Sequence, residues 1–443
     1  MSVLLIQPAH PHRGDQVYLP GGLMNLAGRL IESGLQVRVL DLNFDDLRSH
    51  RALVRASDRV GITAVGKPYI PGIISLTRSL RAMGYERPIM VGGPAVERME
   101  PLVFRRLFAD ERVWQSINDN DLMSVLNQTI ATRYVCGMEQ ALAQLPERRR
   151  KAYLTREFGL WLSDGCTQSC NFCDANKGVP EHYRDFDAFL TEVTYICDEL
   201  QRWGHDTLEV YLSNLDAFQS AEKLERYLKA LYGVASDRGI TVKARCLATT
   251  AYFNKMYRRD SARLARLQAC GLRIIGFGVD GADPDVWARE NKRHNTVAGV
   301  KKALQTCLDE GITVEMLMVI GFNQDGPRAL ASSILSSLRW THRGVILRPY
   351  LAKPIVQEMS QGEVVPFLRD PRKLRSLDYA ALASRVTHPR RAQRWMVNAT
   401  YLSLIALLTP VGRNTTFPIL PEEGNRLRRR LTRLVNRYMP FDR

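Results

Sequence analysis

The sequence predicts an α/β protein: an N-terminal parallel sheet covered by helices on both faces, a partial (β/α)6 barrel and a mainly helical C-terminal region. Two observations lead to this class. Short apolar runs alternate with helical patterns of about 10 to 15 residues, which is typical of parallel sheets. This alternation stops near Thr132 and then restarts. The length of 443 residues is enough for two or three domains.

The first domain is expected over residues 1–135, where each apolar strand precedes a helical pattern. Its predicted strands are Val3–Pro8, Val37–Leu42, Arg59–Val65 and Pro88–Pro94. Its predicted helices are Gly22–Ser33, Ile73–Met83 and Glu97–Phe108. Gly34 is expected to end the first helix.

A basic linker is predicted over residues 136–157, a barrel over 158–355 and a helical extension over 356–443. The predicted barrel strands are Phe158–Ser163, Leu208–Ser213, Thr241–Cys246, Arg273–Asp280, Thr313–Gly321 and Val345–Leu351. The helical patterns between them include Phe186–Trp203 and Val297–Glu310. In such a barrel the chemistry belongs at the C-terminal ends of the strands.

The net charge of +16 favours an anionic partner. We expect an anionic small molecule or peptide as substrate, and nucleic acid is less favoured. Part of the charge lies in Asn425–Arg437, whose leucines have helical spacing, so a solvated closing helix or a basic amphipathic helix is expected. The apolar run Tyr401–Leu408 is shorter than the roughly 20 residues that cross a bilayer. With no secretion signal visible, the sequence predicts a cytoplasmic protein without a transmembrane segment.

Three of the eight cysteines are gathered in SDGCTQSCNFCDANKG, directly after the first predicted barrel strand. Cys166, Cys170 and Cys173 form the pattern CxxxCxxC. Clustered cysteines in a cytosolic protein indicate a metal site more often than disulfides. A structural zinc site normally has four ligands, and His182, nine residues after Cys173, could be the fourth. A four-iron cluster held by three thiolates leaves one iron open to another ligand, and we prefer this interpretation.

This spacing, with Phe172 just before the third cysteine and the motif after the first of six β/α units, resembles the radical S-adenosylmethionine superfamily. The resemblance covers about Phe158–Tyr350. It implies that Cys166, Cys170 and Cys173 bind a 4Fe–4S cluster whose open iron binds S-adenosylmethionine, and that Phe172 lies at the cofactor. In that family an electron from the cluster cleaves S-adenosylmethionine to methionine and a 5'-deoxyadenosyl radical. A reductant such as flavodoxin or ferredoxin is therefore an expected partner.

The resemblance implies further candidates at the end of the second barrel strand, where the family binds the methionine amino group. Here the segment reads SNLDAF, so Ser213, Asn214 and Asp216 are candidates. The segment departs from the glycine-rich form found in many members. Capping of the following helix is an equally good interpretation of Asp216.

Candidates at the next three strand ends follow from the same resemblance. Arg245, taken to end the third strand, would reach the S-adenosylmethionine carboxylate bidentately. Asp280, at the end of the fourth, would face the ribose or serve as a turn residue. Gly321, at the end of the fifth, would lie beside the adenine through its backbone.

The N-terminal region resembles the cobalamin-binding domain that precedes the barrel in one branch of this superfamily. The similarity lies in VLLIQP, in VGIT with Thr63, and in MVGGP with Gly92, Gly93 and Pro94. Glycines after a strand let the backbone approach a large flat ring, and such sheets bind ligands beyond the strand ends. However, Ser116–Asp121 stands where many members have a GEGE-like turn. Cobalamin binding and a vestigial or substrate-docking domain therefore both stay open.

Together these resemblances imply an oxygen-sensitive enzyme whose adenosyl radical removes a hydrogen atom from the substrate. With cobalamin bound, it would be a carbon methyltransferase; without cobalamin, a ring closure, epimerisation or rearrangement is expected. A transfer-RNA methylthiotransferase is disfavoured, because residues 1–135 lack the cysteines for its second cluster. A non-catalytic iron–sulfur electron carrier or redox sensor is the alternative from another class.

Overall fold

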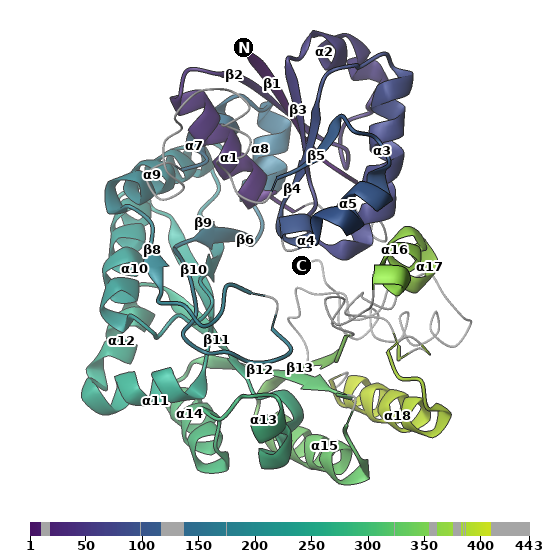
Figure 1. Ribbon diagram of the computed structural model, residues 1–443. Helices are drawn as coiled ribbons and strands as arrows, with labels where there is room; N and C mark the ends of the chain where they lie inside the picture. Colours follow the sequence, from purple (N-terminus) through teal and green to yellow (C-terminus); the bar gives the residue numbers. More distant parts are fainter. Residues whose placement is uncertain are drawn as a thin grey trace.

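The computed structural model describes residues 1–9, 18–97, 99–116, 137–173, 175–322, 324–353, 361–374, 382–383, 385 and 387–408. Within them the chain forms two parallel sheets with helices packed around both (Figure 1). The predicted fold class is confirmed: a doubly wound N-terminal sheet, a partial barrel and a C-terminal region whose described residues are mainly helical.

The N-terminal sheet is Rossmann-like, with five parallel strands in the order β2-β1-β3-β4-β5. Its strands are β1 (Ser2–Gln7), β2 (Gln36–Asp41), β3 (Arg59–Thr63), β4 (Ile89–Gly92) and β5 (Val113–Gln115). Its helices are α1 (Gly21–Glu32), α2 (Arg51–Ala56), α3 (Ile70–Ala82), α4 (Pro94–Glu97) and α5 (Pro101–Phe108). Side chains of β1 enter two separate hydrophobic cores, one with α1 and one with α3 and α5. An all-apolar run is what such a strand, buried on both faces, requires.

The second sheet has six parallel strands in the order β13-β12-β11-β10-β9-β6. They are β6 (Phe158–Trp161), β9 (Thr207–Ser213), β10 (Thr241–Ala248), β11 (Leu272–Gly278), β12 (Thr313–Ile320) and β13 (Ile346–Leu351). A small antiparallel ribbon, β7 (Ser163–Asp164) with β8 (His182–Tyr183), follows the first strand. The covering helices are α9 (Phe186–Arg202), α10 (Ala221–Ser236), α11 (Thr250–Arg259), α12 (Ala262–Ala269), α13 (Pro284–Arg289), α14 (Val297–Asp309) and α15 (Pro327–Thr341). All six barrel strands lie within a few residues of their predicted positions.

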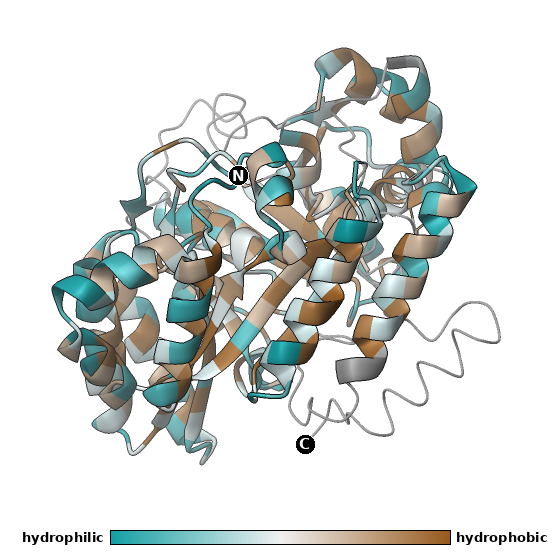
Figure 2. Ribbon diagram, turned by 90° about the horizontal axis from the view of Figure 1, so that it is seen from below, coloured by the Kyte–Doolittle hydropathy of each residue, from teal (hydrophilic) through white to brown (hydrophobic). Residues whose placement is uncertain are grey.

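The barrel strands have two chemically different faces. On β10, Val242, Ala244 and Cys246 are buried in the hydrophobic core under the helices. Lys243 and Arg245 point to the opposite face, because side chains alternate along a strand. That face lines the inside of the barrel. Figure 2, coloured by residue hydropathy, shows pale and teal segments between brown ones along the strands.

Part of the predicted linker is helical and packs on both sheets. It contains α7 (Glu139–Ala143) and α8 (Glu147–Leu154). The Tyr153 hydroxyl donates to the Asp41 carboxylate at 2.5 Å, and Arg149 forms an ion pair with Asp45. One hydrophobic core runs from α1 through α7 into the barrel. The two sheets are therefore joined by a packed interface.

The C-terminal region contacts both sheets. Helix α16 (Gln361–Arg369) buries Phe367 and Leu368, and α17 (Pro371–Leu374) buries Leu374, in the core with α3 and α5. Helix α18 (Arg391–Leu408) packs on α15 and β13 (Figure 1). The predicted basic segment Asn425–Arg437 lies outside the described residues.

Among the helices that the structure describes, none combines the length and the apolar character needed to span a bilayer.

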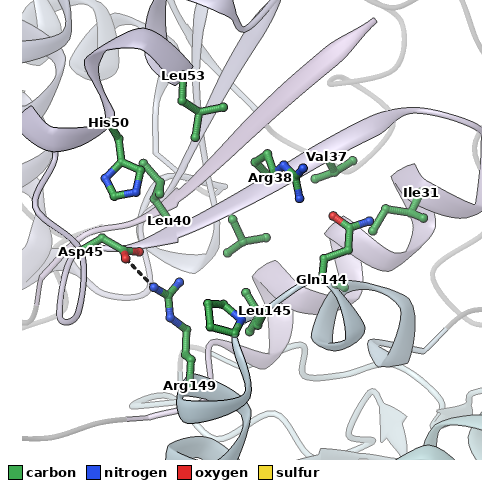
Figure 3. Close-up of a pocket in the computed structure, with 13 residues that line it drawn as sticks. Ile31, Val37, Arg38, Leu40, Asp45, His50, Leu53, Gln144, Leu145 and Arg149 are labelled. Carbon is green, nitrogen blue, oxygen red and sulfur yellow. Dashed lines mark hydrogen bonds and ion pairs between the residues drawn. The ribbon is translucent and has the colours of Figure 1, made fainter.

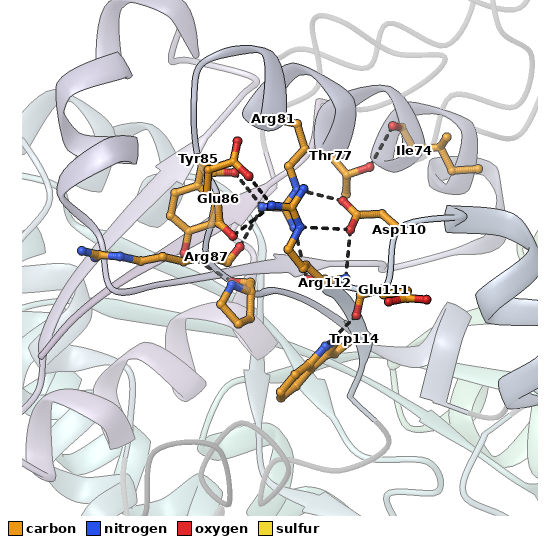
Figure 4. Close-up of polar contacts among 11 residues, drawn as sticks. Ile74, Thr77, Arg81, Tyr85, Glu86, Arg87, Asp110, Glu111, Arg112 and Trp114 are labelled. Carbon is orange, nitrogen blue, oxygen red and sulfur yellow. Dashed lines mark hydrogen bonds and ion pairs between the residues drawn. The ribbon is translucent and has the colours of Figure 1, made fainter.

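Arg81 connects three segments at the amino ends of β4 and β5 (Figure 4). Its Nε donates to Asp110 Oδ2 at 2.8 Å. Its Nη1 donates to the carbonyl oxygens of Tyr85 and Arg87 at 2.6 and 2.7 Å. The guanidinium thus ties the end of α3 to the loops that begin both strands.

We expect Arg81→Ala to lower the free energy of unfolding by about 1 to 3 kcal/mol, because charge-assisted hydrogen bonds are lost. Urea unfolding of the cluster-free protein measures this. Arg78→Ala is the matched control, since Arg78 is an exposed residue of the same helix. Equal losses in both variants would contradict the assignment.

Candidate functional site

The cysteine loop connects β7 to β8, and hydrogen bonds between its own backbone groups close it. The Cys166 N–H donates to the Asn176 carbonyl at 2.9 Å, and the Val179 N–H donates to the Cys166 carbonyl at 3.1 Å. A turn brings the other two cysteines together, because the Cys173 N–H donates to the Cys170 carbonyl at 3.2 Å. All three thiols therefore lie on one compact loop beyond the first barrel strand.

The three cysteines are free thiols; Cys170 is buried and the other two are half-buried. Burial raises the pKa of Cys166 to about 11 and also raises the pKa of Cys170. Ligation must therefore displace protons from them. The described side chains contain no group of three or more Cys, His, Asp or Glu already arranged as a metal site. The donor set itself, three thiols on one loop, fits an iron–sulfur cluster with one open iron.

Gln219, between β9 and α10, holds one side of the cysteine loop. Its Oε1 accepts from both the backbone N–H and the hydroxyl of Thr167 at 2.9 Å. Its Nε2 donates to the Gly165 carbonyl at 3.1 Å. The sequence contains no signal for this contact, which connects residues more than 50 positions apart.

The segment between α13 and α14 holds the other side of the loop. The Asn171 N–H and amide donate to the carbonyls of Glu290 and Arg289 at 3.0 and 2.9 Å. The Asn291 amide donates to the Ser169 carbonyl at 2.9 Å. The cysteine loop is thus fixed from two sides, and sequence reasoning missed both contacts.

The SNLDAF segment lies at the end of β9, as expected, and Ser213 is its last strand residue. The Ser213 carbonyl accepts from the Leu162 N–H at 3.2 Å, which joins it to the start of the cysteine segment. Asn214 is buried, and its side-chain amide has no hydrogen-bond partner among the described residues. A buried amide in this condition is suited to bind a ligand.

Asp216 is fully buried, and its carboxylate accepts from the Thr249 hydroxyl at 2.6 Å and from the Phe218 N–H at 3.3 Å. Burial raises the pKa of Asp216 to about 7. Capping of α10 is the wrong interpretation, because the residue before α10 is Ser220. Asp216 instead connects the β9–α10 loop to Thr249, the residue that caps α11.

Asp280 lies in a turn, η3 (Asp280–Ala282), and both of its carboxylate oxygens have partners. One accepts from the Val319 N–H at 3.0 Å, and the other accepts from Lys292 Nζ at 2.6 Å. The interpretation as a turn residue is confirmed. Asp280 faces Lys292, which sequence reasoning missed.

Lys292 and His294 belong to the α13–α14 segment that also holds the cysteine loop. Lys292 is buried, and its Nζ lies 5.6 Å from the centroid of the Phe172 ring. Both ring nitrogens of His294 are buried without a partner among the described residues. Burial lowers the pKa of His294 to about 4, so this imidazole is neutral near pH 7. Phe172 also packs on Phe322, with ring centroids 5.4 Å apart.

The expected position of Arg245 is wrong. Strand β10 continues to Ala248, so Arg245 lies inside the barrel below the strand end. Its guanidinium forms ion pairs with Glu157 at 3.0 Å and Glu315 at 3.1 Å, and Glu315 also pairs with Arg348 at 2.5 Å. This charge network neutralises Arg245 within the protein.

Gly321 follows β12, as expected, but its backbone groups are used within the protein. Its N–H donates to Asp325 at 3.0 Å, and its carbonyl is bonded to the His388 ring. Its φ of +75° is in the left-handed region, and a Cβ there would lie 2.6 Å from Val397 on α18. The glycine therefore permits the contact with α18, and the expected adenine contact through its backbone does not fit.

The four candidates in the N-terminal sheet lie together at the ends of β3 and β4. Thr63 ends β3, Gly92 ends β4, and Pro94 begins α4. Gly93 has a φ of +100°, and a Cβ there would lie 3.1 Å from the Ala64 carbonyl. Gly93 is thus required by the close approach of β3, whether or not a ligand is bound. Most of Ser116–Asp121 lies outside the described residues.

A separate pocket lies beside the edge strand β2, between the N-terminal sheet and α7–α8 (Figure 3). His50, Gln144 and the Asp45–Arg149 ion pair line it. None of the predicted site residues does so. This pocket belongs to the junction of the two domains.

Asp216 should make the stability of the cluster-free protein depend on pH. Its folded-state pKa of about 7 is above the unfolded value of about 4, so folding favours the protonated carboxyl. This contribution is fully present below about pH 4 and is lost as the pH rises through the folded-state value. Urea unfolding across this range should therefore show Asp216→Asn gaining stability relative to the wild type as the pH rises. A constant difference between the two proteins would contradict this.

A comparison with protein-family models matches the region that contains the cysteine loop and most of the barrel. Residues 162–333 match the family model described as the radical SAM superfamily. A search among curated proteins found no match.

Two solved structures share the fold over most of the chain. One is the radical S-adenosylmethionine methyltransferase TsrM from Kitasatospora setae with cobalamin and a 4Fe–4S cluster bound. It has 15% identity and a TM-score of 0.60, over 79% of this chain and 74% of that one. The other is the cobalamin-dependent S-adenosylmethionine radical enzyme OxsB, at 14% identity and a TM-score of 0.60 over 84% of this chain and 55% of that one. At such identities the likeness shows a common fold.

Proposed function

We propose that this chain is a radical SAM enzyme, and more specifically a cobalamin-dependent methyltransferase acting on an unactivated carbon, because residues 162–333 match the radical SAM superfamily model. The observation that carries the proposal is the combination of the two sheets. A loop with three cysteines follows the first barrel strand. The preceding Rossmann-like sheet shares its fold with two solved structures, TsrM with cobalamin bound and the cobalamin-dependent enzyme OxsB.

Cys166, Cys170 and Cys173 would hold the 4Fe–4S cluster. When bound, the cluster supplies one electron that cleaves S-adenosylmethionine to methionine and a 5'-deoxyadenosyl radical. The contacts of Gln219 and Asn171 fix the loop from two sides, which orients the three thiols. An external low-potential donor of the flavodoxin or ferredoxin class is the proposed source of the electron.

S-adenosylmethionine fits the unpartnered polar groups around the loop. The Asn214 amide and the His294 ring are buried without hydrogen-bond partners among the described residues, so a ligand with amino, carboxylate and hydroxyl groups would satisfy them. Ser213 lies beside Asn214 at the strand end. The Phe172–Phe322 pair provides an apolar wall that excludes water from a reactive radical.

Cobalamin would lie beyond the ends of β3 and β4, beside Thr63, Gly92, Gly93 and Pro94. In Figure 1, α4 marks this end of the sheet and lies on the side that faces the barrel. When bound, methylcobalamin would supply the methyl group to the substrate. The chain itself would provide a fixed binding edge at the ends of β3 and β4, because the Ala64 N–H donates to the Gly92 carbonyl at 2.7 Å.

The proposed substrate is an anionic small molecule or peptide, which the net charge of +16 favours. Ring closure, epimerisation or rearrangement is the second candidate function. The observation that favours it is the packing of Gly93 against Ala64, because this explains the glycine without a bound ring.

Replacing Cys166, Cys170 and Cys173 together by alanine should abolish iron binding and the formation of 5'-deoxyadenosine. The measurement is iron and sulfide content after anaerobic reconstitution, followed by product analysis with dithionite and S-adenosylmethionine. Cys197→Ala is the matched control, because this thiol is buried in the core under α9 and should keep both properties. An intact cluster that yields no 5'-deoxyadenosine in the wild type would favour an electron carrier or redox sensor.

Thr63→Trp should reduce cobalamin binding at least about tenfold, because an indole at the end of β3 would occupy space proposed for the ring. Cobalt content and the absorbance spectrum after incubation with hydroxocobalamin measure this. Thr63→Ser preserves the size and polarity of the site and should bind as the wild type does. A wild-type protein that retains no cobalt would exclude methyl transfer from cobalamin.

A further inference from the structure

Lys292 places a buried positive charge beside the cysteine loop. The residue is only 6% exposed, and its Nζ lies 5.6 Å from the centroid of the Phe172 ring. Phe172 stands between Cys170 and Cys173, whose turn is closed by a backbone hydrogen bond. The ammonium group is thus packed against the turn that carries two of the three thiols.

Asp280 holds this lysine in place. Its carboxylate accepts from Lys292 Nζ at 2.6 Å and from the Val319 N–H at 3.0 Å, so its orientation is fixed. Asp280 and Ala282 both have left-handed backbones, with φ values of +35° and +47°. Such conformations are strained in non-glycine residues and are often found at functional sites.

A buried ion pair is also less favourable in free energy than apolar side chains that fill the same space. Removing two charges from water is unfavourable, and apolar residues of similar size often stabilise a core better. Packing therefore does not explain the Lys292–Asp280 pair. Its position beside the cysteine turn suggests an electrostatic purpose.

A cluster held by three thiolates becomes more negative when it accepts an electron. Charge near a cluster and hydrogen bonds to its sulfurs set its reduction potential. A buried cation nearby stabilises the reduced form, because the surrounding protein screens charge weakly. Lys292 Nζ lies 5.6 Å from the centroid of the Phe172 ring, so this charge is beside the turn that would bind the cluster.

We propose that Lys292, positioned by Asp280, raises the reduction potential of the cluster bound by Cys166, Cys170 and Cys173. The cluster gains one electron from a low-potential one-electron donor, and no bond forms or breaks in this step. Lys292 is a positioning residue in this proposal, since it acts through the cluster. The inference rests on the proposed function in one respect, because the cluster must be present.

The test is a redox titration of the cluster-loaded protein without S-adenosylmethionine, followed by electron paramagnetic resonance. At a fixed solution potential, Lys292→Met should lower the ratio of reduced to oxidised cluster at least tenfold, which is about 59 mV for a one-electron couple. Asp280→Asn should shift the potential in the opposite direction. The double variant should lie between the two single variants.

Two further variants separate charge from packing. Lys292→Arg keeps the positive charge and should keep the potential close to that of the wild type. Lys301→Met removes an exposed lysine of α14 and should leave the potential unchanged. Iron and sulfide content is measured first for each protein, so that only fully loaded samples are compared.

An unchanged potential in loaded Lys292→Met would overturn the proposal, as would shifts of the same sign in Lys292→Met and Asp280→Asn. If Lys292→Met does not bind the cluster, the Asp280→Asn variant is the test. A reduction potential in Asp280→Asn that is not higher than that of the wild type overturns the proposal. A wild-type protein that binds no cluster would refute the proposed function instead. The iron measurement distinguishes these two failures.

Discussion

Three thiols must lie close enough together to bind one iron–sulfur cluster, while its fourth iron stays open to another ligand. The contacts around the cysteine loop meet this constraint. A short loop cannot meet it without support, because its backbone has many conformations. Here the loop is closed by its own hydrogen bonds and then held from outside by Gln219 and by the α13–α14 segment. The remaining described cysteines lie in the hydrophobic cores, where they do not compete for iron.

The same parallel arrangement serves both sheets. Strand ends of the barrel carry the cysteine loop and the Asn214 amide, and strand ends of the N-terminal sheet carry Thr63 and the two glycines. The continuous core from α1 through α7 into the barrel sets the distance between these edges. In the proposed function a cofactor would bind at each of these edges, and the packed helical linker would keep the two sites at a constant distance.

Much of the fold follows from the sequence, because its main signals are local. The apolar run of β1 reflects burial on both faces, and the helical patterns of α9 and α14 were predicted within one residue at each end. Strand β5 was missed, since its three residues are too few to show a period. The cysteine spacing is equally local, which is why that part of the site could be recognised.

Long-range features were not predictable in the same way. Arg245 was misplaced because the end of β10 depends on its neighbours, and Leu247 and Ala248 extend the strand. The roles of Gln219 and Lys292 come from contacts between segments that are far apart in sequence. Asp280 was recognised as a turn residue, but its partner could be found only from the structure.

The C-terminal region has a consequence for how the molecule is assembled. Helices α16 and α17 complete the core around α3 and α5, and α18 covers β13 and the Gly321 turn. In a growing chain, the apolar surfaces that these three helices cover stay exposed until the helices have been made. Loss of these helices would therefore expose apolar surface on both sheets, which favours aggregation of the incomplete protein.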